Sequence, residues 1–525
     1  MQTRTQGSSS SSDVEGTAVL EADMPKRDAV VGAFQHAWSA YVERDAMGCD
    51  EYHSISKKGS NLTEEGGIGY TVVDAIDTMQ IMGLDEEYNR ARKWIEHELT
   101  FDRDGNFNTF ETTIRVLGGL LSAYHLSGND QLFLDKAVDL ADRMMPGFET
   151  PSGLPLSMVN LKKSEGVDDP SYAGLVSTAE AATLQLELKY LSFLTDNDNY
   201  WDRAEGVMKV IKAAKIASGL APIYLDAKNG QFMLSEIRLG SRGDSYYEYL
   251  LKQYLQTDKT EQVYINMYQE ALVGIRDNLV RKGATQGLTF TIEMQPAGRR
   301  EDGTGDWRIS PKQDHLVCFL GGSLMLGATT AGATGDHVSR PPTQSELTPT
   351  AWEQWKFGEE IIKTCMATHD TATGLSPEIA YFYMEGDNES SERRKVKDWY
   401  IKGNDDPISP SYDARYILRP ETIESLFIAY RLTGNRKYRD QGWKIFQSIE
   451  KYCKLEEGGY ASILNVDDVK SEKMDKMETF FLSETLKYLY LLFSDDSVIP
   501  LDQYVFNTEA HPLPKFTPSV RSAYW

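Results

Sequence analysis

A pattern of paired helices, repeated along the chain, is the sequence feature that most limits how this protein can fold. Seven segments combine an acidic residue, an apolar helical run, a turn rich in Gly, Asn or Asp and, in most cases, a second helix with a polar face. ETIESLFIAYRLTG followed by RKYRDQGWKIFQSIE is one example. The pattern predicts buried helices that alternate with exposed ones. The acidic residues that mark the segments are Asp74 or Asp77, Glu111, Glu180, Asp244, Asp314, Glu421, and Glu478 or Glu484.

The irregular spacing of these segments favours a closed ring over an open superhelix. Asp74 and Glu111 are close in sequence, whereas Asp314 and Glu421 are far apart, and a solenoid stacks units of nearly constant length. We therefore predict an all-α fold, an (α/α) barrel of helical hairpins. Strand-like phrases between the helices, such as GLPLSMVNL and GLTFTIEM, predict small β-hairpins and loops at the ends of the ring.

No compositional break resembles a domain linker, so we expect one large domain. Its predicted limits are residues 28–512, preceded by a flexible, Ser-rich leader over 1–27 and followed by a tail over 513–525. Stretches 330–350 and 384–410 are predicted to be polar surface insertions. With 41% hydrophobic residues, the chain can build an extensive core.

Composition also excludes several classes of partner. A formal net charge of -24 opposes binding to nucleic acid and to anionic membrane surfaces, which carry the same sign. No apolar run reaches the roughly 18 residues of a membrane span, and we expect no membrane contact by the chain itself. No signal or anchor is visible, so the sequence leaves open whether the protein is cytosolic or lost a targeting segment.

Cysteines and glycosylation sequons place weak limits on the compartment. The four cysteines are too few for a disulfide scaffold and lack CxxC spacing, so they permit one or two bridges. The sequons at Asn61 and Asn388 would suit a secreted glycoprotein, although chance alone would supply as many.

The leading acidic residues acquire a second meaning if the inner helices run in the same direction. Their N-termini would then meet at one end of the ring, and the carboxylates would share a cavity. Each of them alone is explained as well by helix capping. Together, so many like charges would need arginines or a divalent cation, most plausibly calcium, to offset their repulsion.

Such a cavity suits a neutral polyol. Carboxylates and a metal ion bind hydroxyl groups. Aromatic rings stack on sugar faces, and the candidates are Tyr246, Tyr247, Phe480 and Phe481. Glycoside hydrolysis needs two carboxyl groups, one to protonate the leaving oxygen and one to activate water or attack carbon. From the residues alone we therefore infer a sugar-active enzyme.

Several phrases resemble the class I α-1,2-mannosidases of glycoside hydrolase family 47. They include FETTIRVLGGLLSAY, GDSYYEYLLKQ, DHLVCFLGG, LRPETIESLF and VFNTEAHP, and the likeness runs from about Phe34 to Pro512. The resemblance implies an (α/α)7 barrel of seven helical hairpins closed at one end by a β-hairpin. It also implies an inverting, calcium-dependent hydrolase that trims terminal α-1,2-linked mannose from high-mannose N-glycans such as Man9GlcNAc2.

The same resemblance assigns roles to three carboxylates. Glu111 in FETTIR is expected to be the general acid, acting through a water, and Glu421 in RPETIES the general base that activates the attacking water. Asp244 in RGDSYYEY is expected to give electrostatic support, with an acid or base role as the alternative.

Calcium (Ca2+) is expected at Thr508, bound directly by its hydroxyl and carbonyl oxygens. Glu424, Glu484 and Glu509 are expected to hold calcium-bound waters. The metal would hold the 2- and 3-hydroxyls of mannose and help to position the attacking water.

Further residues are matched to the substrate site and to a disulfide. Arg242 is the position at which endoplasmic-reticulum-type members carry arginine, and it implies selection of one glycan branch. The family disulfide matches Cys318 and Cys365, which implies an oxidising compartment. The other substrate-binding residues implied by the motifs are Arg115, Glu180, Asp314, His315, Arg419, Phe480 and Glu484.

Two alternatives remain open at this point. One is a relative that binds mannose glycans for degradation with weak or no hydrolysis. The other is a different (α/α) enzyme, such as another glycosidase or a terpene-cyclase-like protein, although no DDxxD motif occurs. For the mannosidase we expect a monomer in the lumen of the endoplasmic reticulum or Golgi, or a secreted protein, acting on glycoproteins.

Overall fold

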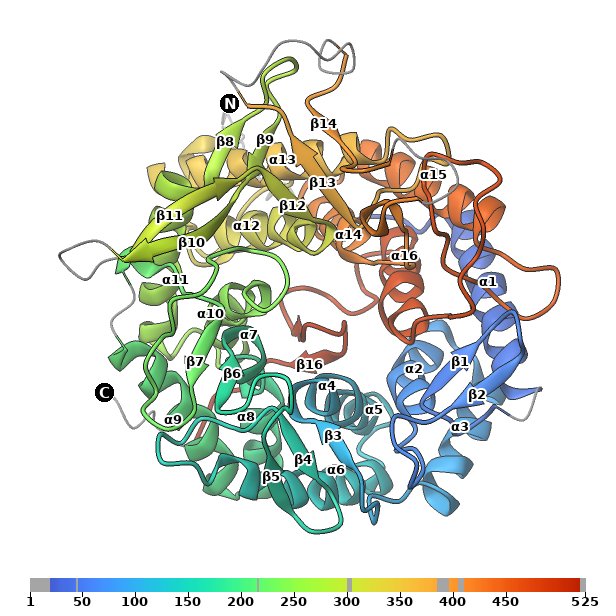
Figure 1. The fold of residues 1–525 in the computed structure, drawn as a ribbon. Helices are drawn as coiled ribbons and strands as arrows, with labels where there is room; N and C mark the ends of the chain where they lie inside the picture. The colour runs from blue at the N-terminus through green and yellow to red at the C-terminus, as the bar shows by residue number, and fades with distance from the viewer. Residues whose placement is uncertain are drawn as a thin grey trace, which may run out of the picture.

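The computed structural model describes residues 19–43, 46–214, 217–299, 305–384, 396–404 and 410–519, and its helices form a closed ring (Figure 1). The inner helices are α2 (Tyr70–Met82), α5 (Gly118–Leu126), α8 (Gln185–Thr195), α10 (Asp244–Gln256), α12 (Phe319–Thr330), α14 (Glu421–Thr433) and α16 (Leu486–Phe493). The outer helices are α3 (Asp85–His97), α6 (Gln131–Met144), α9 (Asp198–Ala213), α11 (Gln262–Gly274), α13 (Pro349–Thr368), α15 (Arg436–Tyr452) and α1 (Met24–Val42).

The difference between inner and outer helices follows the predicted apolar patterns. Helix α14 is buried on nearly every side, whereas α15 buries only one face, including Tyr438, Ile445 and Ile449. The turn between them has a left-handed Gly434 (φ 65°) and the N-cap Asn435, whose side chain accepts a hydrogen bond from the Lys437 amide. A glycine that ends one helix and an Asx residue that starts the next explain why the turn is so short.

The seventh helical pair differs from the sequence pattern. Inner helix α16 is not followed by an outer partner and packs instead against α1, from the other end of the chain. Helix α1 begins at Met24, inside the segment predicted as a leader, and β16 extends into the stretch predicted as a tail. The two ends of the chain thus close the ring together.

Small antiparallel sheets connect the helices, as the strand-like phrases predicted. Figure 1 shows most of them around the ring and β16 near its centre. The two-stranded sheets are β1 (Glu51–His53) with β2 (Lys58–Ser60), β6 (Leu175–Ser177) with β7 (Tyr224–Asp226), β8 (Val280–Lys282) with β9 (Thr289–Thr291), β10 (Glu293–Arg299) with β11 (Gly305–Ser310), and β15 (Tyr504–Phe506) with β16 (Pro512–Pro514). The three-stranded sheets are β3 (Asn106–Asn108), β4 (Met158–Asn160) and β5 (Glu165–Val167), and β12 (Lys312–Asp314), β13 (Ile379–Phe382) and β14 (Trp399–Tyr400).

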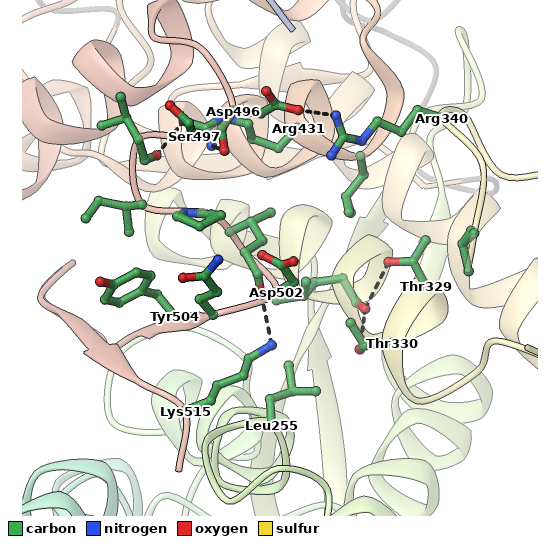
Figure 2. Close-up of a pocket in the computed structure, with 18 of the residues that line it drawn as sticks. Leu255, Thr329, Thr330, Arg340, Arg431, Asp496, Ser497, Asp502, Tyr504 and Lys515 are labelled. Carbon is green, nitrogen blue, oxygen red and sulfur yellow. Dashed lines mark hydrogen bonds and ion pairs between the residues drawn. The ribbon is translucent and has the colours of Figure 1, made fainter. Parts of the chain in front are cut away.

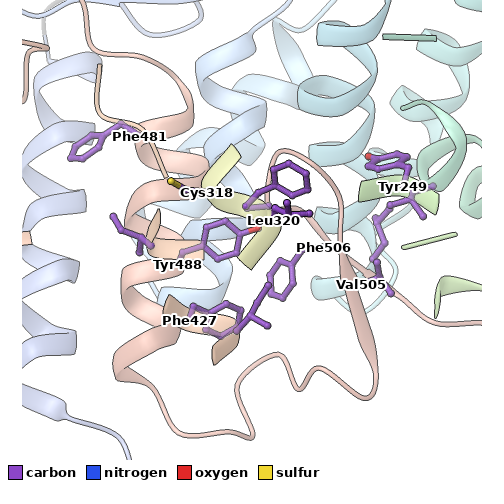
Figure 3. Close-up of a cluster of buried hydrophobic side chains, with 14 of the residues drawn as sticks. Tyr249, Cys318, Leu320, Phe427, Phe481, Tyr488, Val505 and Phe506 are labelled. Carbon is purple, nitrogen blue, oxygen red and sulfur yellow. The ribbon is translucent and has the colours of Figure 1, made fainter. Parts of the chain in front are cut away.

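The C-terminal hairpin β15–β16 packs into the apolar core of the ring (Figure 3). The ring centroid of Phe506 lies 5.7 Å from that of Phe427 on α14 and 5.6 Å from that of Tyr488 on α16. Aromatic burial of this kind holds the hairpin in place. Its turn, residues 507–511, therefore projects into the middle of the barrel.

The predicted disulfide Cys318–Cys365 is present, with a Cα–Cα distance of 5.8 Å, and it joins the start of α12 to α13. Cys49 and Cys453 are free thiols. Asn61 is exposed, while Asn388 and part of the predicted insertion 384–410 lie outside the described residues. Within the described part of the chain, none of the helices has the length and apolar character that crossing a bilayer requires.

Candidate active site

One pocket of about 340 Å³ lies at the N-terminal ends of the inner helices. Asp244 and Glu421 are the first residues of α10 and α14, and Glu180 belongs to a short helix, α7 (Thr178–Ala181), before α8. This confirms that the inner helices point their N-termini to one end. The predicted residues that line the pocket are Glu111, Arg115, Glu180, Arg242, Asp244, Arg419, Glu421, Glu424, Phe480, Glu484, Thr508 and Glu509.

Two of these carboxylates sit at interruptions of regular helix. Glu111 ends the short helix α4 (Thr109–Glu111), where its amide donates to the side chain of Asn108, and a π-helical turn, Thr112–Leu117, follows. Glu484 lies within another π-helical turn, Phe481–Thr485. Such turns are often found at functional sites because they reorient side chains that a regular α-helix would place elsewhere.

Glu421 is held in its ionised form. Burial opposes its charge, but the Arg419 guanidinium, 3.6 Å away, and His315, whose Nδ1 lies 2.7 Å from Glu421 Oε2, outweigh it and lower the pKa. The other nitrogen of His315 lies 3.1 Å from the Thr422 hydroxyl, which fixes the imidazole ring. His315 thus supports Glu421 from behind and does not line the pocket itself.

Asp244 has the opposite electrostatic environment. Burial raises its pKa to about 7, and the nearby charges of Glu248, Asp314 and Glu421 act in the same direction. The hydrogen bond from the Ser245 amide, 2.9 Å long, only partly compensates. The pocket therefore contains one carboxyl group biased to lose its proton and one biased to keep it.

Arg115 connects three acidic residues, two of which line the pocket. Its guanidinium donates to Glu111 at 2.8 Å and to Glu509 at 2.6 Å, and it lies 3.6 Å from Asp74. It also lies 5.8 Å from the centroid of the Phe480 ring. Arg115 is therefore both the i,i+4 partner of Glu111 and a part of the pocket wall.

The turn of the C-terminal hairpin brings Thr508 to the pocket. The Thr508 hydroxyl donates to Glu248 at 2.9 Å, and its amide donates to the Tyr249 hydroxyl at 3.3 Å. Tyr249 in turn donates to the buried Glu187 on α8. Contacts to α8 and α10 therefore fix the backbone and the side chain of Thr508.

Beneath the pocket, His511 anchors the same turn. Its Nδ1 lies 2.7 Å from Asp77 and its Nε2 lies 3.1 Å from Asp74, both on α2, and all three side chains are fully buried. Lys487 on α16 also pairs with Asp77, at 2.9 Å. Asp74 and Asp77, which the sequence offered as pocket residues, therefore serve to hold the turn.

The residues around Thr508 fit a hard divalent cation. They offer oxygen atoms, with the Lys252 ammonium beside Glu248 and Glu424. The oxygens are the Thr508 hydroxyl and carbonyl and the carboxylates of Glu248, Glu424, Glu484 and Glu509. Burial and mutual repulsion raise the pKa of Glu424 to about 8 and those of Glu484 and Glu509 well above the usual range. A bound cation would allow these groups to ionise.

The sequence does not predict carboxylates that coordinate the metal directly. Among the described residues, no group of three or more His, Cys, Asp or Glu side chains is arranged to hold one ion.

Some predicted residues lie elsewhere. Asp314 pairs with Lys312 at 2.7 Å and accepts from the Ser241 amide at 3.3 Å, so it supports the loop behind Arg242 and does not line the pocket. All the aromatic residues offered as sugar platforms are buried, and among them Phe480 alone lines the pocket. The others are Tyr246, Tyr247 and Phe481.

Sequence reasoning missed Glu248 and Lys252. Both lie on α10 below Asp244, Lys252 pairs with Glu248, and its Nζ lies 3.8 Å from Glu424. A signal was present, because the charged residues of α10, at positions 244, 248 and 252, are each one helical turn apart. Residues at this spacing share a face of the helix, and Asp244 and Glu248 both line the pocket.

Comparisons with known proteins agree with this geometry. The model of glycosyl hydrolase family 47 matches residues 33–515. A mannosyl-oligosaccharide 1,2-alpha-mannosidase of Candida albicans is 47% identical over 92% of this chain and 82% of its own length. The endoplasmic reticulum mannosyl-oligosaccharide 1,2-alpha-mannosidase of Homo sapiens is 43% identical over 94% of this chain and 64% of its own.

A solved structure shares both the fold and the sequence pattern. It is the alpha-1,2-mannosidase from Trichoderma reesei, which is 28% identical, has a TM-score of 0.81, and is matched over 94% of this chain and 100% of its own. Because the family model covers most of the chain and the relatives share more than two fifths of their residues with it, the chain belongs to glycosyl hydrolase family 47.

Proposed function

We propose that this protein is an inverting, calcium-dependent α-1,2-mannosidase that trims terminal mannose from high-mannose N-glycans. The observation that carries the proposal is the convergence of Glu111, Asp244, Glu421 and Thr508 on one pocket, although they come from distant parts of the chain. The volume of about 340 Å³ is in the range of small-molecule sites. Relatives named as mannosyl-oligosaccharide 1,2-alpha-mannosidases support the substrate class.

Glu421 acts as the general base in this proposal. Its low pKa keeps it ionised, and His315 fixes its carboxylate while Arg419 provides positive charge beside it. An ionised, oriented carboxylate can accept the proton of a water molecule as that water attacks the anomeric carbon. In an inverting enzyme the water attacks the face opposite the leaving group, which gives β-mannose.

The general acid is Glu111 or Asp244, and the two differ in their surroundings. Glu111 is ion-paired with Arg115 at 2.8 Å. Asp244, with a pKa of about 7, retains a proton near neutral pH and could pass it to the leaving oxygen. The electrostatics therefore favour the acid role for Asp244 over the supporting role that the motif suggested, with Glu111 as the alternative.

Calcium would be held by Thr508, with Glu424, Glu484 and Glu509 around it. When bound, it supplies positive charge that holds neighbouring sugar hydroxyls and polarises water. The chain itself contributes a rigid turn, held by α2, α8, α10 and α16, that presents Thr508 to the pocket. Phe480, flanked by Arg115 and Arg419, offers a ring face on which a sugar can stack.

The setting of the reaction follows from the relatives and the chemistry. A relative named for the endoplasmic reticulum and the disulfide Cys318–Cys365 support a secretory-pathway location. The partners are high-mannose glycans on glycoproteins, and we propose that the enzyme acts as a monomer.

Incubation of the protein with Man9GlcNAc2 in calcium tests the proposal. We expect release of free mannose, and proton NMR at early times should show the β-anomer first. Early α-anomer would contradict inversion. Tight glycan binding without release would instead support a glycan-binding degradation factor.

A further inference from the structure

Arg242 reaches the pocket from a loop whose backbone is tightly fixed. It has a left-handed conformation (φ 68°), which is strained for a residue with a side chain, and its carbonyl accepts a hydrogen bond from the Ala179 amide at 3.0 Å. The glycines on either side of it are closely packed. A Cβ atom at Gly240 would lie 2.4 Å from Asp314 Oδ2, and one at Gly243 would lie 2.3 Å from the Arg238 carbonyl oxygen. The loop therefore sets where the Arg242 side chain begins.

Three other side chains then fix the guanidinium. Nη1 of Arg242 lies 3.1 Å from Glu180 Oε1. The guanidinium carbon lies 5.1 Å from the ring centroid of Tyr172 and 5.5 Å from that of Tyr224. The two tyrosine rings stack on each other, with centroids 5.4 Å apart.

The tyrosines come from two chain segments with their own anchors. Tyr224 begins β7 and pairs with Ser177 of β6. Tyr172 lies in the turn before β6, where its amide donates to the Asp169 carbonyl and its own carbonyl accepts from the Leu175 amide. The backbone of both tyrosines is thus held by contacts that do not depend on Arg242.

This cluster lies at the more open side of the pocket. The side chain of Arg242 is 28% exposed and that of Glu180 is 19% exposed, whereas Glu509 beside Thr508 is only 4% exposed. Tyr172 retains 40% of its surface. A glycan whose terminal sugar is bound deep in the pocket would therefore have its more distant mannose residues near Arg242, with an aromatic face beside them.

We propose that Tyr172 and Tyr224 are specificity-determining residues, which hold Arg242 in place and complete with it a subsite for mannose residues that lie beyond the terminal α-1,2-linked pair of the glycan. The guanidinium donates to sugar hydroxyls, and the exposed tyrosine face packs on the apolar side of the hexose. This inference rests on the proposed function. It adds the prediction that the subsite contributes to the recognition of long glycans and not to the cleavage step itself.

Two substrates separate the subsite from the chemistry: the disaccharide of two α-1,2-linked mannoses and Man9GlcNAc2. For Tyr172→Ala and Tyr224→Ala, we expect kcat/KM on Man9GlcNAc2 to fall about fivefold, the cost of losing one partly exposed cation–π contact. More than one eight-mannose isomer should appear. On the disaccharide, kcat/KM should stay within about twofold of the wild type, because its short aglycone makes few contacts at the rim.

Two controls test the physical reason. Tyr172→Phe and Tyr224→Phe keep the rings and should behave like the wild type on both substrates. Tyr412→Ala removes another Arg–Tyr stack, with Arg415 3.1 Å from the ring centroid, that does not border the pocket, and it should leave both activities unchanged.

Equal loss on the two substrates at an unchanged melting temperature, or no loss on either, would overturn the inference. Failure of the wild type to cleave the disaccharide and the glycan would instead overturn the proposed function on which it depends. These two failures are distinguishable, because the second is seen without any variant.

Discussion

Two cavities lie at opposite ends of the helical ring, and they differ in how their charged groups are used. The larger, about 1070 Å³, lies at the C-terminal ends of the inner helices, where Leu255, Thr330 and Arg431 border it (Figure 2). The smaller, about 340 Å³, lies at the N-terminal ends and contains the buried carboxylates. Size alone would select the wrong end.

The cationic side chains of the larger cavity bond to other groups of the protein. Arg431 donates to the carbonyls of Leu491 and Val498, Lys259 to that of Thr330, and Lys515 to that of Leu501. Cations at helix C-termini satisfy carbonyls that have no partner within the helix. At the other end the carboxylates exceed what capping needs, and their excess charge is what can bind metal and substrate.

Exchange of Glu421 for glutamine should give the largest effect and shows directly which end is active. Loss of the general base is expected to lower kcat by about 10³-fold. Asp502→Asn, a carboxylate that borders the larger cavity, is the matched control and should retain full activity. Mannose release from Man9GlcNAc2 measures both, and an inactive Asp502→Asn with a normal Glu421→Gln would reverse the comparison.

The pH profile sharpens the assignment within the active pocket. If Asp244, with its pKa of about 7, supplies the proton, activity should fall as pH rises through 7. Asp244→Asn should then lower kcat by about 100-fold and abolish this fall in activity above pH 7. Glu111→Gln should still show the fall. If the fall disappears in Glu111→Gln and persists in Asp244→Asn, the roles of the two residues are exchanged.

Removal of calcium tests whether the excess carboxylates form a metal site. Chelation should abolish activity, and added calcium should raise the melting temperature, because a ligand at about 100 times its Kd stabilises the fold by about 2.7 kcal/mol. Thr508→Val should weaken this response. A melting temperature that does not respond to calcium, with activity intact in a chelator, would disprove the site.

The anchoring of the hairpin turn is tested by His511→Gln. Fully buried Asp74 and Asp77 would lose a partner, at a cost of about 3 kcal/mol in the free energy of unfolding. His125→Gln is the control, since it removes a single hydrogen bond, to Tyr504 of the same hairpin, worth about 1 kcal/mol. Urea unfolding of both variants gives the comparison, and equal costs would argue against a special role for His511.

Lys515, in the larger cavity, should give the smallest effect. Burial lowers its pKa from 10.5 to about 8. Between these values the unfolded chain binds more protons, so stability rises with pH through this window, and below pH 8 the charged lysine is a full cost. Lys515→Met should be more stable than the wild type at pH 7, on the order of 1 kcal/mol, with a gain that shrinks toward pH 10. Activity should not change.

Much of the fold could be predicted because periodicity and turn residues are local signals. The apolar run that begins at Glu421 and the amphipathic run after Asn435 identify an inner and an outer helix without reference to the rest of the chain. The pairing of α16 with α1 could not be predicted in this way. It joins opposite ends of the sequence, and no local pattern records which helix fills the last gap in a closed ring.

For the site, the sequence by itself determined which residue types stand at the starts of the inner helices, and with the family motifs it identified Glu111, Asp244, Glu421 and Thr508. Only the tertiary structure decided that Asp74 and Asp77 face His511, that Asp314 supports a loop, and that Glu248 belongs to the pocket. The physical reason is that a carboxylate looks the same in sequence whether it caps, pairs or catalyses. Its role depends on burial and on the charges that distant segments place beside it.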